Sequence, residues 1–322
     1  MAKKKPARDI EKAGPQTLLE AVEYFADPDV AHNFVARLRW PNEARCPRCD
    51  ETRTSFLRSR RVWKCLACKK QFSVKVGTIF EDSPLSLSKW LPAMWQIANC
   101  KNGISSYELA RALGVTQKTA WFMLHRIRLA MQAGSFDRKM GGTVEVDETY
   151  IGGKVRNMHK HRQEKARNAG RWAGKVAVMG LLERHTGTVR MKIVKGTKRA
   201  ELFGIIKENV EEQSALYTDA LPSYASMNHK YQHEFIDHSE AYVRGAVHTN
   251  GLENFWSLLK RAICGTYVAV EPFHLFRYLD EQAFRFNNRT IDDAGRFLLA
   301  AASIFGKRLT YKELIGETVA AI

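Results

Sequence analysis

The sequence predicts an α/β fold: a mixed β-sheet with covering helices in the C-terminal half, preceded by a zinc ribbon and a helix-turn-helix. Three observations lead to this prediction. Two Cys-x-x-Cys pairs lie in the first quarter of the chain, a helical pattern with a glycine turn follows them, and after Gly141-Gly142 the pattern changes to alternating apolar segments. A length of 322 residues accommodates two or three domains of roughly 100–200 residues each.

The composition is that of a folded protein. Hydrophobic residues make up 45% and aromatic residues 10% of the chain, which is enough for a core and excludes wholesale disorder. No apolar run approaches the ~18 residues that a membrane span requires. The basic N-terminus lacks the apolar segment of a secretory signal. We therefore expect a cytoplasmic protein with no membrane partner.

The charge indicates a polyanionic partner. The chain has 51 Lys and Arg against 34 Asp and Glu, a formal net charge of +17. Nucleic acid is the commonest ligand of such a field, although a basic surface that serves only solubility would give the same total. Residues 1–140 hold 25 of the basic and 13 of the acidic side chains. A second basic run at residues 154–175 predicts either a solvated loop or an arm that contacts phosphates.

Four cysteines form two knuckles, Cys46-Pro-Arg-Cys49 and Cys65-Leu-Ala-Cys68, with fifteen residues between them. Two such chelating pairs fit a tetrahedral Zn²⁺ site with four thiolates and no open position, so the predicted role is structural. Disulfides are not expected in a cytosolic chain. Alternating residues at 60–64 and 71–76 predict the short strands of a zinc ribbon.

Residues 106–128 are predicted to form two helices joined by a tight turn. Gly114 permits the turn, and Thr116 can cap the second helix. Apolar residues of both helices share one face, which leaves the other side chains outward, Trp121 and Arg128 among them. We predict that the second helix enters the major groove of DNA, against the alternative of a plain helical hairpin. Its predicted DNA-contacting residues are Gln117, Lys118 and Arg126.

The C-terminal half is predicted to be an α/β domain. Alternating apolar segments occur at 143–150, 175–182 and 188–194. They are followed by a helix at 199–209, a strand at 215–219, another helix, a short strand at 234–236 and a helix that starts near Asn250. A mixed sheet with helices on its faces accommodates this order.

Three acidic residues are predicted at the ends of these elements: Asp147 after the first strand, Asp219 after the fourth, and Glu253 in the helix that follows. Carboxylate oxygens are the ligands that Mg²⁺ prefers. Two such ions ~3.5–4 Å apart can activate the attacking oxygen and stabilise the leaving one in phosphoryl transfer. One acid at a surface turn is common, whereas the three together predict a metal-dependent site. Glu148 should point to the other face of the strand.

Three sequence blocks resemble the signature blocks of DDE transposases. The first two are Val146-Asp147-Glu148-Thr149-Tyr150 and Tyr217-Thr218-Asp219-Ala220. The third is His248-Thr249-Asn250-Gly251-Leu252-Glu253, followed by Trp256, Lys260 and Arg261. With the upstream Cys₄ ribbon, residues 20–290 are similar to the zinc-ribbon-bearing bacterial insertion-sequence transposases of family fifteen-ninety-five. The resemblance implies a ribonuclease H-like catalytic domain.

The resemblance also implies the chemistry and the partners. Asp147, Asp219 and Glu253 would be the catalytic residues and would bind Mg²⁺ or Mn²⁺, while Zn²⁺ in the ribbon is structural. The substrate would be double-stranded DNA, namely terminal inverted repeats and target DNA, with no small-molecule substrate. A homo-oligomer would hold the DNA ends in the synaptic complex, associated with the nucleoid. The activity would be that of a DDE-type transposase, a polynucleotidyl transferase that cleaves and joins strands.

Further candidates lie near these acids. The resemblance matches Lys260, two helical turns past Glu253 on the same predicted face, to a basic residue that would contact DNA, and Arg261 follows it. Asn250, one turn before Glu253, is the alternative third ligand or a helix cap. His248 is expected to cap the helix, to position DNA or simply to pack.

A repeat of charged residues follows at Glu281, Arg285 and Arg289. Their spacing of four fits a ladder of surface ion pairs along one helix face. The family resemblance suggests instead that Arg285 and Arg289 face DNA.

The predicted domains are a helical arm at 1–40, the zinc ribbon at 41–80, a helix-turn-helix region at 81–140, the ribonuclease H-like domain at 141–290 and a C-terminal helical tail at 291–322. Two other functions fit parts of the pattern. One is a non-catalytic DNA-binding regulator, and the other is a nuclease or resolvase of the ribonuclease H-like class.

Overall fold

The computed structural model describes residues 14–132, 138–153, 159–160, 163–164, 174–196, 198–219, 230–236 and 247–317. The chain forms two compact units, Met1–Ala133 with Asn288–Ile322, and Gly134–Asn287. Most of the predicted basic run at 154–175 and the helix expected after Asp219 lie outside the described residues.

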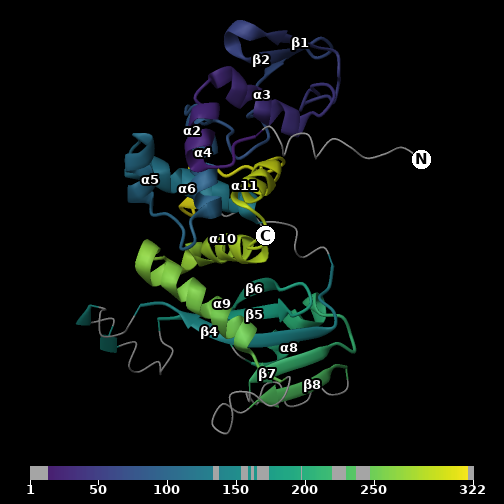
Figure 1. Cartoon of the computed structure of the whole chain (residues 1–322), viewed down its shortest axis with the longest axis vertical. Helices are drawn as coiled ribbons and strands as arrows, with labels where there is room; N and C mark the ends of the chain where they lie inside the picture. Colours follow the sequence, from purple (N-terminus) through teal and green to yellow (C-terminus); the bar gives the residue numbers. More distant parts are fainter. Residues whose placement is uncertain are drawn as a thin grey trace. The chain divides into compact units, whose positions relative to one another are not determined.

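The first unit is built around one apolar helix. Its helices are α2 (Leu18–Tyr24), α3 (Pro28–Arg39), α4 (Leu87–Asn99), α5 (Ser106–Leu113), α6 (Gln117–Met131), α11 (Asp293–Ala302) and α12 (Tyr311–Leu314) (Figure 1). Helix α4 packs against α2, α3, α6 and α11. The ring of Phe297 on α11 lies 5.2 Å from that of Trp95 and 5.7 Å from those of Phe25 and Phe34. The C-terminal segment, expected only as a helical tail, therefore supplies part of this core.

A three-stranded antiparallel sheet forms the ribbon. Strands β1 (Thr54–Leu57), β2 (Val62–Cys65) and β3 (Gln71–Phe72) lie in that order, with the 3₁₀ turn η1 (Arg58–Arg60) between the first two. The last strand is shorter than predicted because the chain turns after it, where the Val76 N–H donates to the Ser73 carbonyl at 3.3 Å.

The two predicted helices and the tight turn between them are confirmed, whereas entry of the second helix into DNA stays a prediction. Helix α5 begins with a capping box between Ser105 and Glu108. It ends at Gly114 in the left-handed conformation (φ +60°), which a residue with a side chain rarely adopts. Thr116 caps α6 by accepting a hydrogen bond from the Thr119 N–H.

The second unit is a five-stranded mixed sheet with the order β6-β5-β4-β7-β8. Its strands are β4 (Thr143–Ile151), β5 (Val176–Glu183), β6 (Thr188–Val194), β7 (Ala215–Asp219) and β8 (Gln232–Ile236). Strands β4, β7 and β8 are parallel neighbours, whereas β5 and β6 are antiparallel to their neighbours. This strand order is the ribonuclease H-like arrangement that the family resemblance implies.

Helices cover both faces of this sheet. Helix α8 (Arg199–Asn209) packs on a core that includes Val144 and Val146 of β4. Helices α9 (Asn250–Arg261) and α10 (Leu275–Asn287) pack on the other face, and the π-helix η4 (Ala262–Tyr267) and the 3₁₀ turn η5 (Pro272–His274) lie between them in sequence. Side chains alternate along a strand, so Glu145 and Asp147 point toward α9.

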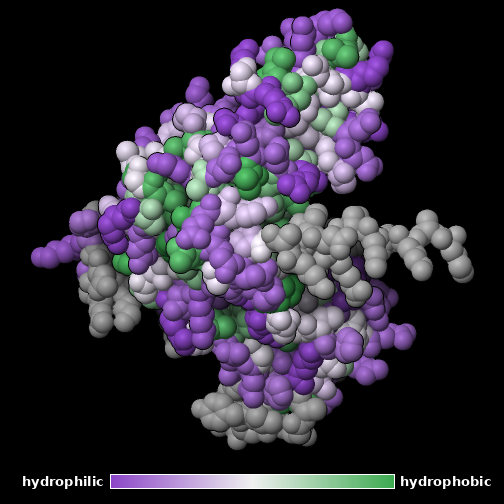
Figure 2. Space-filling view, turned by 45° about the horizontal axis from the view of Figure 1, so that its top comes forward, coloured by the Kyte–Doolittle hydropathy of each residue, from purple (hydrophilic) through white to green (hydrophobic). Residues whose placement is uncertain are grey.

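The visible surface in Figure 2 is mostly hydrophilic, with smaller hydrophobic patches between the polar residues. No helix in the described part of the chain has both the length and the hydropathy needed to cross a bilayer.

Candidate metal centres and nucleic-acid interface

The four cysteines of the ribbon converge. Their sulfur atoms lie within 4.8 Å of one another, a condition that no other His, Cys, Asp or Glu cluster meets among the described residues. Cys46 Sγ is 3.7 Å from Cys68 Sγ, and Cys49 Sγ is 3.6 Å from Cys65 Sγ. Four thiolates at these separations fit tetrahedral Zn²⁺ with no open position, so the site is structural.

The two knuckles close with the same backbone turn. The Cys46 N–H donates to the Glu51 carbonyl at 3.0 Å, and the Cys65 N–H donates to the Lys70 carbonyl at 2.9 Å. The residue after the second cysteine of each knuckle has a positive φ, +57° in one and +60° in the other. A repeated local turn therefore presents two thiolates from each side of the site.

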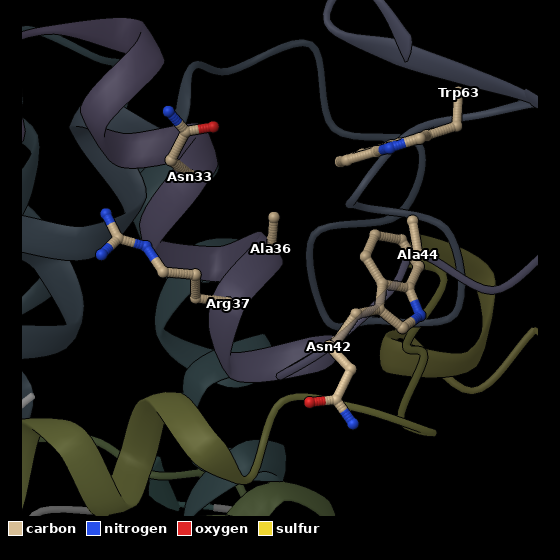
Figure 3. Close-up of a pocket in the computed structure, with 7 residues that line it drawn as sticks. Asn33, Ala36, Arg37, Asn42, Ala44 and Trp63 are labelled. Atoms are coloured by element: carbon tan, nitrogen blue, oxygen red, sulfur yellow. The ribbon is translucent and has the colours of Figure 1, made fainter. Parts of the chain in front are cut away.

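A cavity of about 300 Å³ lies between α3 and the ribbon (Figure 3). Its lining includes Asn33 and Arg37 of α3 and, across the cavity, Asn42 and Trp63. The Trp63 indole stacks on His32 of α3, with ring centroids 5.0 Å apart, so helix and ribbon pack together. Amide and guanidinium groups beside an indole can contact phosphates and base edges, which makes this cavity a candidate nucleic-acid contact.

The predicted DNA-contacting residues on α6 have different environments. Lys118 is exposed, and its ammonium group lies 4.6 Å from the centroid of the Tyr311 ring. Gln117 is half-buried and donates to the Ser106 hydroxyl at 2.8 Å. The first turn of α6 therefore keeps one accessible cation, while the glutamine links the two helices.

The outward position predicted for Arg126 is wrong. Its side chain is 5% exposed and donates to the carbonyls of Ile79, Glu81 and Leu309 at 2.7–3.0 Å. Arg128, also predicted to point outward, is 1% exposed. Segments remote in sequence cover this side of α6, and a pattern of two helices cannot reveal them.

Asp147 and Asp219 lie on the same face of neighbouring parallel strands. Glu145 of β4 is in register with Tyr217 of β7, and each aspartate stands two residues further along its strand. Glu253 lies in the first turn of α9, the helix that covers this face. The structure therefore brings elements carrying all three predicted acids to one region of the sheet.

The environment of Asp147 fits a cation site. Burial is the main cause that raises its pKa to about 6; the hydrogen bond from Trp256 lowers the pKa, and the charges of Asp219 and Glu253 raise it. Carboxylates that repel one another around a half-buried aspartate favour a bound cation, and oxygen ligands suit Mg²⁺ or Mn²⁺.

Glu148 points to the other face, as its position in the strand predicts. Its register partner Met179 belongs to the core beneath α8. Burial, with the charges of Asp147 and Asp219, raises the pKa of Glu148 to about 8. It does not join the three acids on the α9 face.

An unpredicted contact holds Asp147 in place. The Trp256 indole Nε1–H donates to Asp147 Oδ2 at 2.9 Å. Gly180, the register partner of Asp147, makes room for this ring, because a Cβ there would lie 2.6 Å from Trp256 Cζ2. The tryptophan at i+3 from Glu253 was visible in the sequence, but its partner depends on how the helix crosses the sheet.

The start of α9 differs from the expected cap. Thr249, not Asn250, is the N-cap residue, and Asn250 is the first helical residue and is exposed. Lys260 and Arg261 are exposed in the last turn, where contact with DNA stays a prediction.

The prediction of one charged helix face at 281–289 is wrong. Helix α10 ends at Asn287, so Arg289 lies beyond it, although it is exposed. The side chain of Glu281 is 0% exposed and that of Arg285 is 7% exposed, and the two form an ion pair. The Tyr267 hydroxyl donates a hydrogen bond to the same Glu281 carboxylate. Arg285 therefore neither forms a surface ladder nor faces DNA, because its guanidinium is needed to balance a buried carboxylate.

Comparison with known families matches two segments of the chain. Residues 139–287 match the family described as the ISXO2-like transposase domain. Residues 27–71 match the transposase zinc-ribbon domain, a range that includes α3 and the cavity beside it.

Two similar proteins have transposon-related descriptions. The chain is 26% identical over 252 residues to an uncharacterised protein in transposable element ISH50 of Halobacterium salinarum, a match covering 74% of this chain and 84% of that protein. It is 33% identical over 100 residues to an uncharacterised transposase-like protein of Haemophilus influenzae, covering 31% and 80% respectively. A chain in a structure of the simian T-cell lymphotropic virus intasome with PP2A regulatory subunit B56 gamma matches with 15% identity and a TM-score of 0.28, over 59% of this chain and 64% of that one, which is less than two thirds of its length.

Loss of zinc should unfold the ribbon. We expect Cys65→Ser to lose the zinc content and to shift the indole fluorescence, because Trp40 and Trp63 pack against the cysteines and structural zinc contributes about 10–16 kcal/mol of folding free energy. Elemental analysis and fluorescence measure the two effects. Cys264→Ser, at an exposed cysteine outside the ribbon, is the control; equal zinc content in both variants would contradict the assignment.

The stability of the chain without Mg²⁺ or Mn²⁺ should depend on Asp147. Its pKa is raised from 3.8 to about 6 in the folded state. The protonated carboxyl group therefore contributes to the free energy of unfolding in full below pH ~4, and this contribution is lost as the pH rises through ~6. We expect Asp147→Asn to increase the free energy of unfolding by up to about 2–3 kcal/mol at pH 8 and not at pH 4. Urea denaturation with zinc retained measures this; an equal gain at both pH values would refute the electrostatic cause.

Gly180 should tolerate no side chain. In Gly180→Val the new atoms would meet Trp256 and Leu252, so we expect a loss of about 1–3 kcal/mol in stability and a shift of the Trp256 indole N–H resonance. Gly204→Ala on α8 is the control, since nothing lies within 4 Å of its added Cβ and a helical alanine gains up to about 1 kcal/mol. A stable Gly180→Val with an unshifted indole resonance would contradict the packing argument.

Proposed function

The chain belongs to the ISXO2-like transposase family, and from this premise we propose that it binds the terminal inverted repeats of its element and catalyses metal-dependent DNA strand cleavage and strand transfer. One observation carries the catalytic part of the proposal. Asp147 and Asp219 share the face of the sheet that α9 covers, and the charge of Glu253, on α9, raises the pKa of Asp147.

The proposed roles follow from the chemistry of each group. Asp147, Asp219 and Glu253 would hold Mg²⁺ or Mn²⁺, which supplies Lewis-acid stabilisation to the attacking and leaving oxygens in phosphoryl transfer. Trp256 donates to Asp147 Oδ2 while the Glu148 N–H donates to Oδ1 at 2.8 Å. These two hydrogen bonds fix the orientation of the carboxylate, so little reorganisation accompanies the reaction.

DNA binding is proposed for the first unit and for the end of α9. Lys118 on α6, Arg37 beside the ribbon, and the exposed Lys260 and Arg261 would contact phosphates, which position DNA without reading its sequence. Arg126 and Arg285 are not among the proposed phosphate contacts, because both side chains are buried. Synapsis of two DNA ends would use more than one copy of the chain.

The decisive experiment separates chemistry from binding. With the full chain, a duplex carrying its terminal repeat and Mg²⁺, we expect Asp147→Asn and Asp219→Asn to reduce strand cleavage by about 10³-fold, with repeat affinity unchanged within about twofold. The control is Glu208→Gln on α8, which removes an exposed carboxylate paired with Lys192 of β6 and should leave both properties unchanged.

The same assay distinguishes the other functions. A regulator would bind the repeat and cleave nothing in the wild-type chain. A nuclease or resolvase would prefer RNA–DNA hybrids or branched DNA and join no target. Glu253→Gln against Asn250→Ala decides the third ligand, since the larger loss of cleavage identifies it. Full cleavage in Asp147→Asn or Asp219→Asn would refute the proposal.

A further inference from the structure

A second acidic side chain points from β4 toward α9. Glu145 stands two residues before Asp147 on the same face and is 1% exposed. Its Oε1 accepts a hydrogen bond from Arg184 Nε at 2.7 Å, and its Oε2 accepts the backbone N–H of Leu252 at 3.0 Å. One buried carboxylate thus contacts both a cation and the start of a helix.

This contact replaces the usual cap of α9. Thr249 is the N-cap residue, but its side chain makes no capping hydrogen bond. Instead, the carboxylate of Glu145 on β4 accepts a backbone N–H at the start of α9, and its negative charge complements the positive end of the helix dipole. Gly251 allows the approach, because a Cβ there would lie 2.8 Å from Glu145 Oε2.

Arg184, which directly follows β5, extends the contact to His248 and to β7. Its Nη2 lies 2.7 Å from both His248 Nδ1 and the His248 carbonyl oxygen. Its guanidinium carbon lies 4.7 Å from the centroid of the Tyr217 ring on β7. The pair therefore joins β4, the end of β5, β7 and the residues that lead into α9.

We propose that Glu145 and Arg184 form a clamp that positions Glu253 relative to Asp147. The inference rests on the proposed function, since it assigns these two acids to one site. Leu252, whose N–H is held, is adjacent to Glu253, and the acceptor is two residues from Asp147. Trp256 provides a second link between the same strand and the same helix, one turn further on. Two links fix both the height and the rotation of α9 over β4.

The chain offers a matched control for mere stability. Glu183 is 3% exposed, pairs with Arg138 at 2.7 Å and accepts the backbone N–H of Gly141 at 2.9 Å. It combines the same three properties, namely burial, an arginine partner and a backbone donor. It lies on the same sheet, and the hydrogen-bond partners described for its side chain, Arg138, Gly141 and Thr186, belong neither to α9 nor to the predicted acids.

The test compares Glu145→Ala with Glu183→Ala in the full chain. We expect both to lower the melting temperature. In Glu145→Ala alone, hydrogen–deuterium exchange should become faster at residues 250–256, and the affinity for Mn²⁺ should fall by about 10–100-fold, the usual effect of removing a group that orients metal ligands. Glu145→Gln, which keeps an oxygen acceptor for the Leu252 N–H, should recover part of both properties.

The possible outcomes separate the two proposals. Unchanged exchange at 250–256 in Glu145→Ala, or an equal loss of Mn²⁺ affinity in Glu183→Ala, would overturn the clamp. If Glu145→Ala does not fold, the same two measurements on Glu145→Gln and Arg184→Lys decide, and wild-type values in both would overturn it. If the wild-type chain binds no Mn²⁺, the proposed function fails, while the exchange result still decides whether Glu145 holds α9.

Discussion

The geometry of the candidate site depends on how closely α9 approaches β4. Two glycines remove side chains that would keep them apart, Gly180 under the Trp256 ring and Gly251 against the Glu145 carboxylate. Two hydrogen bonds form at this close approach, one from an indole N–H to Asp147 and one from a backbone N–H to Glu145. Apolar packing holds the helix on the sheet, but packing is not directional. The hydrogen bonds determine which residues face each other.

Buried charge is treated differently in different parts of the molecule. Glu145, Glu183 and Glu281 each have an arginine partner, which offsets the cost of removing a carboxylate from water. Asp147 is half-buried beside two more acids, and burial together with their charges raises its pKa. The acids are concentrated at this one place, where we propose that a divalent cation offsets their mutual repulsion.

The two parts of the first unit, the ribbon and the helices, are stabilised in different ways. The ribbon has three short strands and a small buried cluster of Cys46, Cys65 and Phe72 with flanking aromatic residues. Because this buried apolar area is too small to stabilise the sheet by itself, a metal held by four thiolates supplies the remaining stability. The helical part instead gains its core from both ends of the chain, since Phe297 packs beside Phe25, Phe34 and Trp95.

The sequence by itself determined what is local or periodic. The spacing of the cysteines predicted the four-thiolate zinc site. Gly114 and Thr116 predicted the turn and the cap of the helix-turn-helix, and the alternation of apolar residues predicted the strands that carry Asp147 and Asp219. Only the tertiary structure decided which charged side chains are buried, because burial depends on segments remote in sequence. Arg126 is covered by residues near 80 and 309, and Arg285 is bound to a buried glutamate. For the same reason Glu145 and Trp256 gained partners that no spacing could predict: 107 and 109 residues separate the groups that each hydrogen bond joins.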